Sequence, residues 1–253
     1  MAESNFTTPT IEEEMANPLH FKIILQGVSV WNQWRLGNPS IEPDLRGANL
    51  AGLNLSEVDF LYTSLNAADL NSTDLRESIF ACADFTAANL SRADLSRESP
   101  SAGGPGSGTH SAVFASANLS FANLTNTYFE GSNFNQSNLK SANLTGTTFD
   151  YSDLTEADFS DVTLDRSKLI QSSLQGTILN NAQIGNSTLL NLDLSEARGL
   201  DTLVHNGSSI IDLSTMCKSK GAIPEVFLRG CGMSVEYLAA LELMQREIRG
   251  IES

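Results

Sequence analysis

The chain has 253 residues, enough for one large domain or two small ones, and carries 30 acidic against 15 basic side chains, a net charge of −15. Electrostatic binding to nucleic acid requires clustered lysine and arginine, so this balance argues against direct nucleic-acid contact. It suits a soluble, elongated surface and permits basic partners, including proteins whose natural ligand is DNA.

The amino-terminal residues 1–17 lack the basic segment and apolar core of a signal peptide, and we expect a disordered tail there. No apolar run approaches the roughly 18 residues of a membrane span, so no membrane association is expected. Cys82, Cys217 and Cys231 are odd in number and scattered, which indicates a reducing compartment. We therefore expect a cytoplasmic location.

Residues 18–42 are predicted to form a helical cap, with a helix over 18–36. Asn17 suits the N-cap, Pro18 suits the first helical position, and Gly37 ends the helix. Apolar residues recur at helical spacing on one face: Phe21, Ile24, Val28 and Trp31. Because the end of a repeat fold exposes its apolar interior, this face is expected to cover one end.

From residue 43 the sequence falls into groups of five with the form A-[DN]-L-x-x. The first run has Leu or Phe at every central position up to Leu95, and a second run, in a different phase, extends from Ala112 to about residue 198. A period of five fits neither a helix nor a strand, but it fits a chain that turns a corner every five residues. The 28 repeats therefore predict a solenoid for residues 43–198, with the central Leu or Phe pointing inward.

Four sides of five residues make a coil of about 20 residues, so 28 repeats predict about seven coils and a rod about 35 Å long. These repeats, covering about 140 residues, resemble the pentapeptide-repeat family. The resemblance implies an all-β solenoid, a right-handed quadrilateral β-helix, with α-helical caps expected at both ends. The stretch VSVWNQWRLGNPSIEPDLRGANL is also similar to the start of cyanobacterial members.

The phenylalanines provide an internal check on the 20-residue coil, because residues 20 apart should stack ring on ring inside the tube. A Gly-, Ser- and Pro-rich insertion of 14 residues, at about 98–111, is expected to form a mobile surface loop. Looping it out restores the phase of five and aligns Phe60, Phe80, Phe114 and Phe134 in one continuous column. The predicted core ladder contains Phe60, Phe80, Phe114, Phe134, Phe129 and Phe149.

The Asp or Asn before each central residue is expected to hydrogen-bond backbone groups at the corners rather than a ligand. A denser acidic group is the candidate interaction surface: Asp150, Asp153, Glu156, Asp158, Asp161 and Asp165. A catalytic carboxylate pair needs a pocket, which a convex rod with a filled interior does not offer. Catalytic and metal-site motifs are absent from the sequence, so we expect no enzyme, no cofactor and no metal.

Residues 199–253 break the period and are predicted to form a non-repeat segment with a terminal helix that starts at Ser234 and ends near Gly250. That helix has two open interpretations, a seal for the rod or a homodimer contact, and dimerisation through this end is common in the family. The stretch GSSIIDLSTMCKSKGAIPEVFLRGCGMS resembles a segment that precedes TIR domains in some cyanobacterial proteins.

Three functional hypotheses remain. The first is a non-catalytic protein–protein interaction module, a regulatory or adaptor scaffold whose partner the sequence does not identify. The alternative is a DNA-mimicking modulator of a type II topoisomerase, acting by gyrase protection or inhibition, since a negative rod can complement a DNA-binding groove. The third is a sensor or adaptor part of a TIR-linked signalling or defence system.

Overall fold

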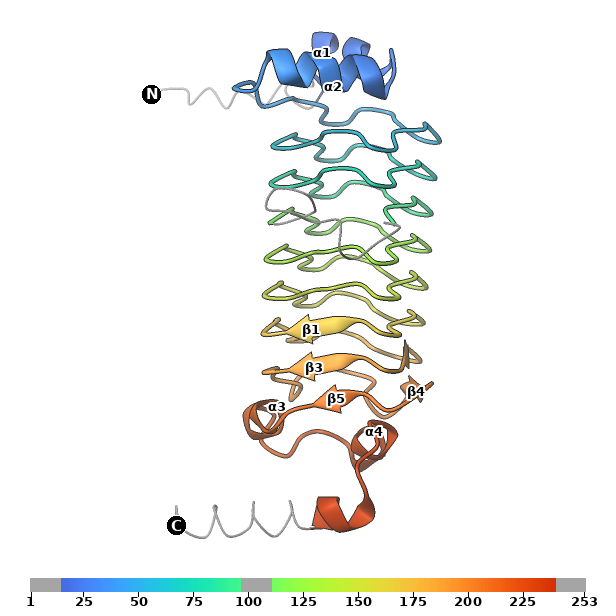
Figure 1. The fold of residues 1–253 in the computed structure, drawn as a ribbon, viewed down its shortest axis with the longest axis vertical. Helices are drawn as coiled ribbons and strands as arrows, with labels where there is room; N and C mark the ends of the chain where they lie inside the picture. The colour runs from blue at the N-terminus through green and yellow to red at the C-terminus, as the bar shows by residue number, and fades with distance from the viewer. Residues whose placement is uncertain (1–14, 97–110, 240–253) are drawn as a thin grey trace, which may run out of the picture.

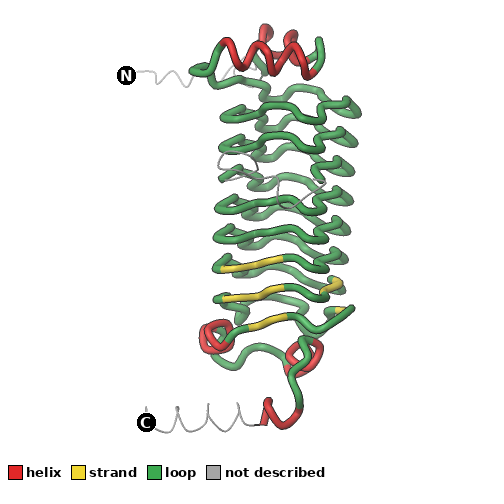
Figure 2. Tube along the Cα trace, viewed as in Figure 1, coloured by secondary structure: helices red, strands yellow, loops and turns green. Residues whose placement is uncertain are grey.

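The computed structural model describes residues 15–96 and 111–239. The backbone winds as a coil whose turns stack along one axis, with helices α1 and α2 across one end and α3 and α4 at the other (Figure 1). Among the described residues, regular strands occur only in the last coils, and the earlier sides are joined by isolated parallel bridges (Figure 2).

Parallel bridges connect residues 20 positions apart, such as Asp44 and Ser64, so one coil contains 20 residues on four sides. Each side, together with the corner that follows it, is here called a face and is identified by its bridge ladder. Face 1 passes through Asp44, Ser64, Asp84, Val113, Asn133, Asp153 and Ser173. Face 2 passes through Asn49, Asp69, Asn89, Asn118, Asn138, Asp158, Ile178 and Arg198. Face 3 passes through Asn54, Asp74, Asp94, Asn123, Asn143, Thr163 and Gln183, and face 4 through Asp59, Ile79, Tyr128, Thr148 and Lys168.

Regular strands continue two of these faces beyond the end of the repeats. On face 4, β1 (Lys168–Ile170), β3 (Thr188–Leu190) and β5 (Ile210–Ile211) form a parallel sheet. On face 3, β2 (Gln183–Ile184) pairs with β4 (Val204–His205). Gln183 pairs with Val204, 21 positions on, and Thr188 pairs with Ile210, 22 positions on. The coil thus continues past residue 198 by admitting one or two additional residues per turn, which hides it from a search for a strict period.

Every corner uses a residue with positive φ two positions after the central Leu or Phe. Glu57, Tyr62 and Ala67 have φ of 63°, 55° and 56°, in the left-handed region that side chains disfavour. The corner is closed by a backbone hydrogen bond, as from the N–H of Thr63 to the C=O of Phe60 at 2.9 Å, which is the geometry of a type II turn. Hydrogen bonds to the neighbouring coil therefore impose this conformation on ordinary residues.

The interior is filled by the central Leu and Phe side chains and by small residues two positions earlier. Where the small residue is Ser or Thr, its hydroxyl donates to a backbone carbonyl 23 residues earlier. Examples are Thr73 to Leu50 at 3.0 Å, Ser78 to Leu55 at 3.1 Å and Thr147 to Leu124 at 2.7 Å. These buried hydroxyls are thereby satisfied and tie consecutive coils together.

The phenylalanine rings stack, but the single predicted column is wrong. Phe60 stacks on Phe80 with ring centroids 6.5 Å apart, whereas Phe114 stacks on Phe85 at 4.9 Å and lies in a different column from Phe80. Asp84 is bridged to Val113, an offset of 29 instead of 20. The insertion therefore adds nine residues to one coil and not 14. Both numbers restore a phase of five, so the phase alone does not determine which face the chain returns to.

Two helices lie across the amino-terminal end, where one was predicted. Helix α1 (Pro18–Ile24) is capped by Asn17, whose Oδ1 accepts from the N–H of Leu19 at 2.9 Å. Helix α2 (Val28–Gly37) follows a break at Gly27, whose φ of 106° is incompatible with a continuous helix. The buried Trp31 donates from Nε1 to the C=O of Asp59 at 2.7 Å, which fastens α2 to the coil.

Helices α3 (Leu213–Lys218) and α4 (Glu225–Gly230) lie at the other end (Figure 1). The side chain of Phe227 in α4 is buried beside Leu194 and Leu203 of the last coil. Of the predicted terminal helix, residues 235–239 are helical and the Oγ of Ser234 accepts from the N–H of Tyr237 at 3.2 Å. The remainder lies outside the described residues, as does the dimer contact predicted for it.

Candidate interaction surface

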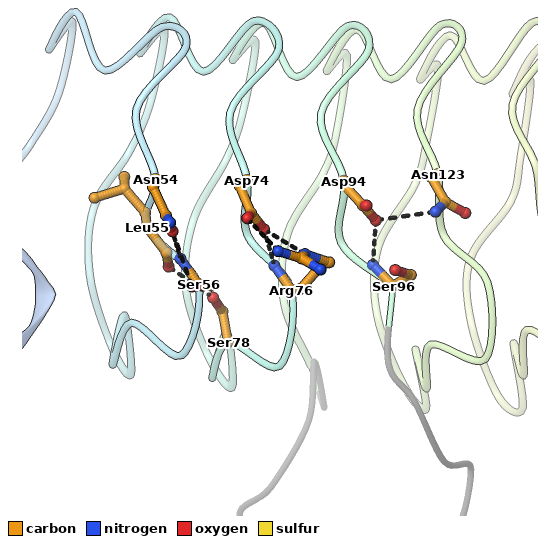
Figure 3. Close-up of polar contacts among 9 residues, drawn as sticks. All are labelled: Asn54, Leu55, Ser56, Asp74, Arg76, Ser78, Asp94, Ser96 and Asn123. Atoms are coloured by element: carbon orange, nitrogen blue, oxygen red, sulfur yellow. Dashed lines mark hydrogen bonds and ion pairs between the residues drawn. The ribbon is translucent and has the colours of Figure 1, made fainter.

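The polar residues of the ladders are turned toward their own backbone. On face 3 the Oδ1 atoms of Asn54 and Asp94 accept the N–H groups two residues further on, at 3.1 and 3.0 Å (Figure 3). Asp94 also accepts from Nδ2 of Asn123 in the next coil at 3.0 Å. These contacts satisfy corner N–H groups, so the Asp and Asn of the repeat serve the fold first.

Several of these aspartates are held ionised by such contacts. Hydrogen bonds from the Arg46 and Arg76 side chains lower the pKa of Asp44 and Asp74. Burial opposes ionisation of Asp84, but hydrogen bonds from Thr86 and Asn66 outweigh it and lower its pKa as well. A carboxylate that stays charged beside permanent donors is poorly suited to proton transfer near neutral pH.

The six predicted surface residues encircle one coil and do not share a face. Asp153 and Glu156 belong to face 1, Asp158 and Asp161 to face 2, Asp165 to face 3 and Asp150 to face 4. No single partner surface can therefore contact all six at once.

Two members of this group are half-buried, and each has an Oδ1 atom that is enclosed without a hydrogen-bond partner among the described residues: Asp150 and Asp165. Burial raises the pKa of Asp150, with Glu130 adding to the effect and Lys168 opposing it. By contrast, Glu156 is exposed and accepts from Nε2 of Gln136 at 2.8 Å. Glu156 is therefore the member best placed to meet a partner.

Face 1 has the most one-sided charge. Its acidic residues are Asp44, Asp84, Asp153, Glu156, Asp193 and Glu196. Its only basic residue within the described ranges is Arg46, which is paired with Asp44 at 2.9 Å. Face 2 instead interleaves Arg92, Lys140 and Arg198 with its acids. A basic partner would therefore be attracted to face 1 more than to face 2.

A cleft of about 290 Å³ opens at the carboxy-terminal end of face 1, between residues 172–175 and residues 193–196. Our sequence analysis did not anticipate this cleft, because Asp193 and Leu194 still fit the repeat. The only signal nearby is the loss of the period at Gly199, one repeat later.

Among residues 15–96 and 111–239 no three His, Cys, Asp or Glu side chains are grouped to hold a metal ion. The described histidines, His20 and His205, lie at opposite ends of the rod, in α1 and in β4. His110 and most of the predicted loop at 98–111 lie outside the described residues. In the described part of the chain, no helix has the length and apolar character needed to cross a bilayer.

Comparison with known families matched the family described as Pentapeptide repeats, with eight copies at residues 44–76, 62–97, 112–150, 142–181 and 152–191. A search of curated proteins found no match.

Among solved structures, the chain is similar to HetL from the cyanobacterium Nostoc sp. strain PCC 7120, a pentapeptide repeat protein involved in heterocyst differentiation regulation. The identity is 24%, the match covers 67% of this chain and 82% of that one, and the TM-score is 0.31. A pentapeptide repeat protein of the Arabidopsis thaliana thylakoid lumen is 32% identical over 46% of this chain and 64% of its own, with a TM-score of 0.21.

QnrB1, a plasmid-mediated fluoroquinolone resistance protein, is 16% identical over 74% of this chain and 96% of its own, with a TM-score of 0.30. Global superposition is therefore poor in all three cases. The match to the repeat family carries the assignment, and with it the right-handed quadrilateral β-helix.

Proposed function

The chain belongs to the pentapeptide-repeat family, and from this premise we propose that it is a non-catalytic protein–protein interaction module, a regulatory or adaptor scaffold. The observation that carries the proposal is the charge of face 1, where six acidic side chains face one already paired arginine. We also propose that the helices at the two ends cap a rod of about seven coils.

The proposed partner is a protein with a basic surface. Charges on a flat outer face act chiefly on association rate and orientation, and salt screens them. Capture of the partner should therefore weaken at high ionic strength. The same charge disfavours direct binding to nucleic acid, whose phosphates would be repelled.

A pair of matched double variants tests this proposal. Asp153→Asn with Glu156→Lys changes face 1, and Asp158→Asn with Asp161→Lys makes the same change in charge on face 2 of the same coil. Asp153 and Asp158 both accept the N–H two residues further on, at 3.0 and 2.9 Å, a bond that Asn preserves. Glu156 and Asp161 occupy equivalent corners with φ of 58° and 59°.

Tagged protein is incubated with native lysate and the retained proteins are identified and quantified. We expect a partner that is retained by the wild type and the face 2 variant but lost from the face 1 variant. Identical retention by all three proteins, or no retained partner with a monomeric chain, would contradict the proposal.

DNA mimicry toward a type II topoisomerase is the second candidate, because a face with this charge also resembles a phosphate backbone. It predicts that micromolar protein inhibits gyrase supercoiling or protects gyrase from a quinolone, and that the face 1 variant does neither. The absence of both effects in the wild type would eliminate this candidate and leave the interaction module unaffected.

A further inference from the structure

The backbone hydrogen-bond ladder of face 1 stops before the last coil. One coil earlier it is intact, with the N–H of Leu154 donating to Ser173 at 2.9 Å and the N–H of Ser173 donating to Ser152 at 3.0 Å. Among the described residues no hydrogen bond joins residues 172–176 to residues 193–195. On face 2 the same two coils remain joined, since the N–H of Leu179 donates to Arg198 at 2.8 Å. The opening is therefore local to face 1.

Helix α3 holds the far side of this opening. The N–H groups of Leu192 and Leu194, which point away from the opening, donate to Oγ1 of Thr215 at 3.1 Å and to Oγ of Ser219 at 2.9 Å. Two hydroxyls at the end of the fold thus replace the carbonyls of a further coil. The last side is bonded to the helix beyond it and not to the coil before it.

The backbone groups that face each other across the cleft are the ones that a parallel ladder would use. The preceding coil presents the N–H of Leu174 and the C=O of Ser172, and the last side presents the N–H and C=O of Asp193; within the described part of the chain all four lack a hydrogen bond to the protein. Two facing strand edges are satisfied together by one extended chain placed between them. The cleft volume of about 290 Å³ lies near the lower end of cavities that bind small ligands.

We propose that this cleft binds an extended peptide segment of a partner protein, inserted as one additional parallel rung and having the pattern small residue, Asn, Leu. The inference rests on the proposed interaction function and deepens it by naming the class of ligand. Recognition would be by strand addition, in which main-chain hydrogen bonds supply affinity and alternate side chains supply specificity.

The pattern follows from the side chains above and below the cleft. The inward positions would lie between Ser172 and Leu192 and between Leu174 and Leu194, which favours a small residue followed by Leu, as in the repeats themselves. The outward position would lie between Ser173 and Asp193.

Asn is favoured at that outward position by contacts elsewhere in the coil. Where Asn and Asp are neighbours on a ladder, the amide donates to the carboxylate, as from Asn89 to Asp69 and from Asn123 to Asp94, both at 3.0 Å. An Asn of the peptide could therefore donate to Asp193, whereas an Asp there would place two carboxylates side by side.

Amide hydrogen exchange on the full chain is the first test. In the free protein the Leu174 amide should exchange far faster than the Leu154 amide, its hydrogen-bonded equivalent one coil earlier. Adding the probe peptide acetyl-Ser-Ala-Asn-Leu-Thr-amide at millimolar concentration should slow Leu174 and leave Leu154 unchanged. If Leu174 in the free protein is as protected as Leu154, the cleft is closed or filled by the chain itself, and the proposal is overturned.

A charge exchange across the proposed rung is the second test. By titration calorimetry the Asn peptide should bind the wild type about tenfold more tightly than the same peptide with Asp in place of Asn, equivalent to about 1.4 kcal/mol. In the Asp193→Asn variant this preference should reverse or disappear, because the introduced side-chain amide can donate to the peptide carboxylate. A peptide N-methylated at Leu, which lacks the N–H aimed at the Asp193 carbonyl, should not bind.

Failure of the Asn peptide to bind, or equal binding of the N-methylated peptide, would overturn the cleft assignment. Either outcome leaves the interaction module standing if face 1 still captures a partner, because the Asp153 and Glu156 substitutions lie outside the cleft lining.

Discussion

The rings of Phe85 and Phe114 stack with centroids 4.9 Å apart and planes 3° from parallel, although 29 positions separate the two residues. The same offset recurs on face 3, where Nδ2 of Asn123 donates to Asp94 at 3.0 Å. Because every complete coil before and after contains 20 residues, nine of the residues between Ser96 and Ser111 are surplus to the register.

Deleting residues 98–106 should therefore preserve the register and leave the midpoint of thermal unfolding within a few degrees of the wild type. Deleting all of 97–110 keeps the phase of five but rotates the second run by one face. That change should lower the midpoint, because it separates Phe85 from Phe114 and Asp94 from Asn123. Circular dichroism melting measures both, and equal midpoints for the two deletions would contradict the offset of 29.

Phe114→Ala should lower the free energy of unfolding by about 3–5 kcal/mol, since it removes a fully buried ring that stacks on Phe85 and on Phe134. Phe121→Ala is the matched control, because Phe121 is 58% exposed at a corner, and the change there should stay within about 0.5 kcal/mol. Chemical denaturation reports both values. A loss below about 1 kcal/mol at Phe114 would contradict its place in the core.

The sequence predicted the coil length and the inward residues because burial recurs with the repeat and selects Leu, Phe and Ala at fixed positions. It predicted the wrong face after the insertion because five divides the difference between nine and 14, so both choices keep every Leu and Phe inward. The break at Gly27 was missed because Ile24, Val28 and Trp31 keep a helical spacing across it.

The candidate surface was harder to predict than the fold. Spacing along the chain showed a dense acidic group, but only the ladder revealed that Asp153 and Asp158 lie on different faces. The cleft was missed for a different reason. Leu192 and Leu194 are buried as the repeat predicts, and the ladder fails because Thr215 and Ser219 of a distant segment bind their N–H groups.

Gly52→Ala should destabilise the protein by about 1 kcal/mol through its backbone alone. Gly52 has φ of 68°, and a Cβ added there would meet nothing within 4 Å, so no steric clash contributes. Ala67→Gly, at a corner with φ of 56°, should be neutral or slightly stabilising, because relief of the left-handed conformation offsets the greater freedom of the unfolded chain. Urea titration distinguishes the two, and a larger loss at Ala67 than at Gly52 would contradict this account of the corners.

Mild acid should loosen both ends of the rod before it affects the coil. Burial lowers the pKa of His20, where Arg35 adds to the effect and the Asp44 carboxylate opposes it, and burial alone lowers the pKa of His205. Nδ1 of His20 accepts the N–H of Asp44 at 3.0 Å, which requires that nitrogen to be unprotonated. Both ring nitrogens of His205 are enclosed without a hydrogen-bond partner among the described residues, beside Phe227 at 5.5 Å.

A lowered pKa means that the unfolded chain binds protons before the folded chain does. Stability from these two residues is therefore complete above the ordinary histidine pKa of 6.5 and declines as the pH falls below it. The aspartates with lowered pKa begin to contribute only nearer their ordinary value of 3.8, so the range from pH 7 to 5 isolates the histidines. We expect the urea midpoint of the wild type to fall across this range, and His205→Leu, which replaces an unsatisfied ring with an apolar side chain against Phe227, to reduce the fall. A midpoint that stays constant from pH 7 to 5, or an unchanged slope in His205→Leu, would show that the buried imidazole does not control the carboxy-terminal end.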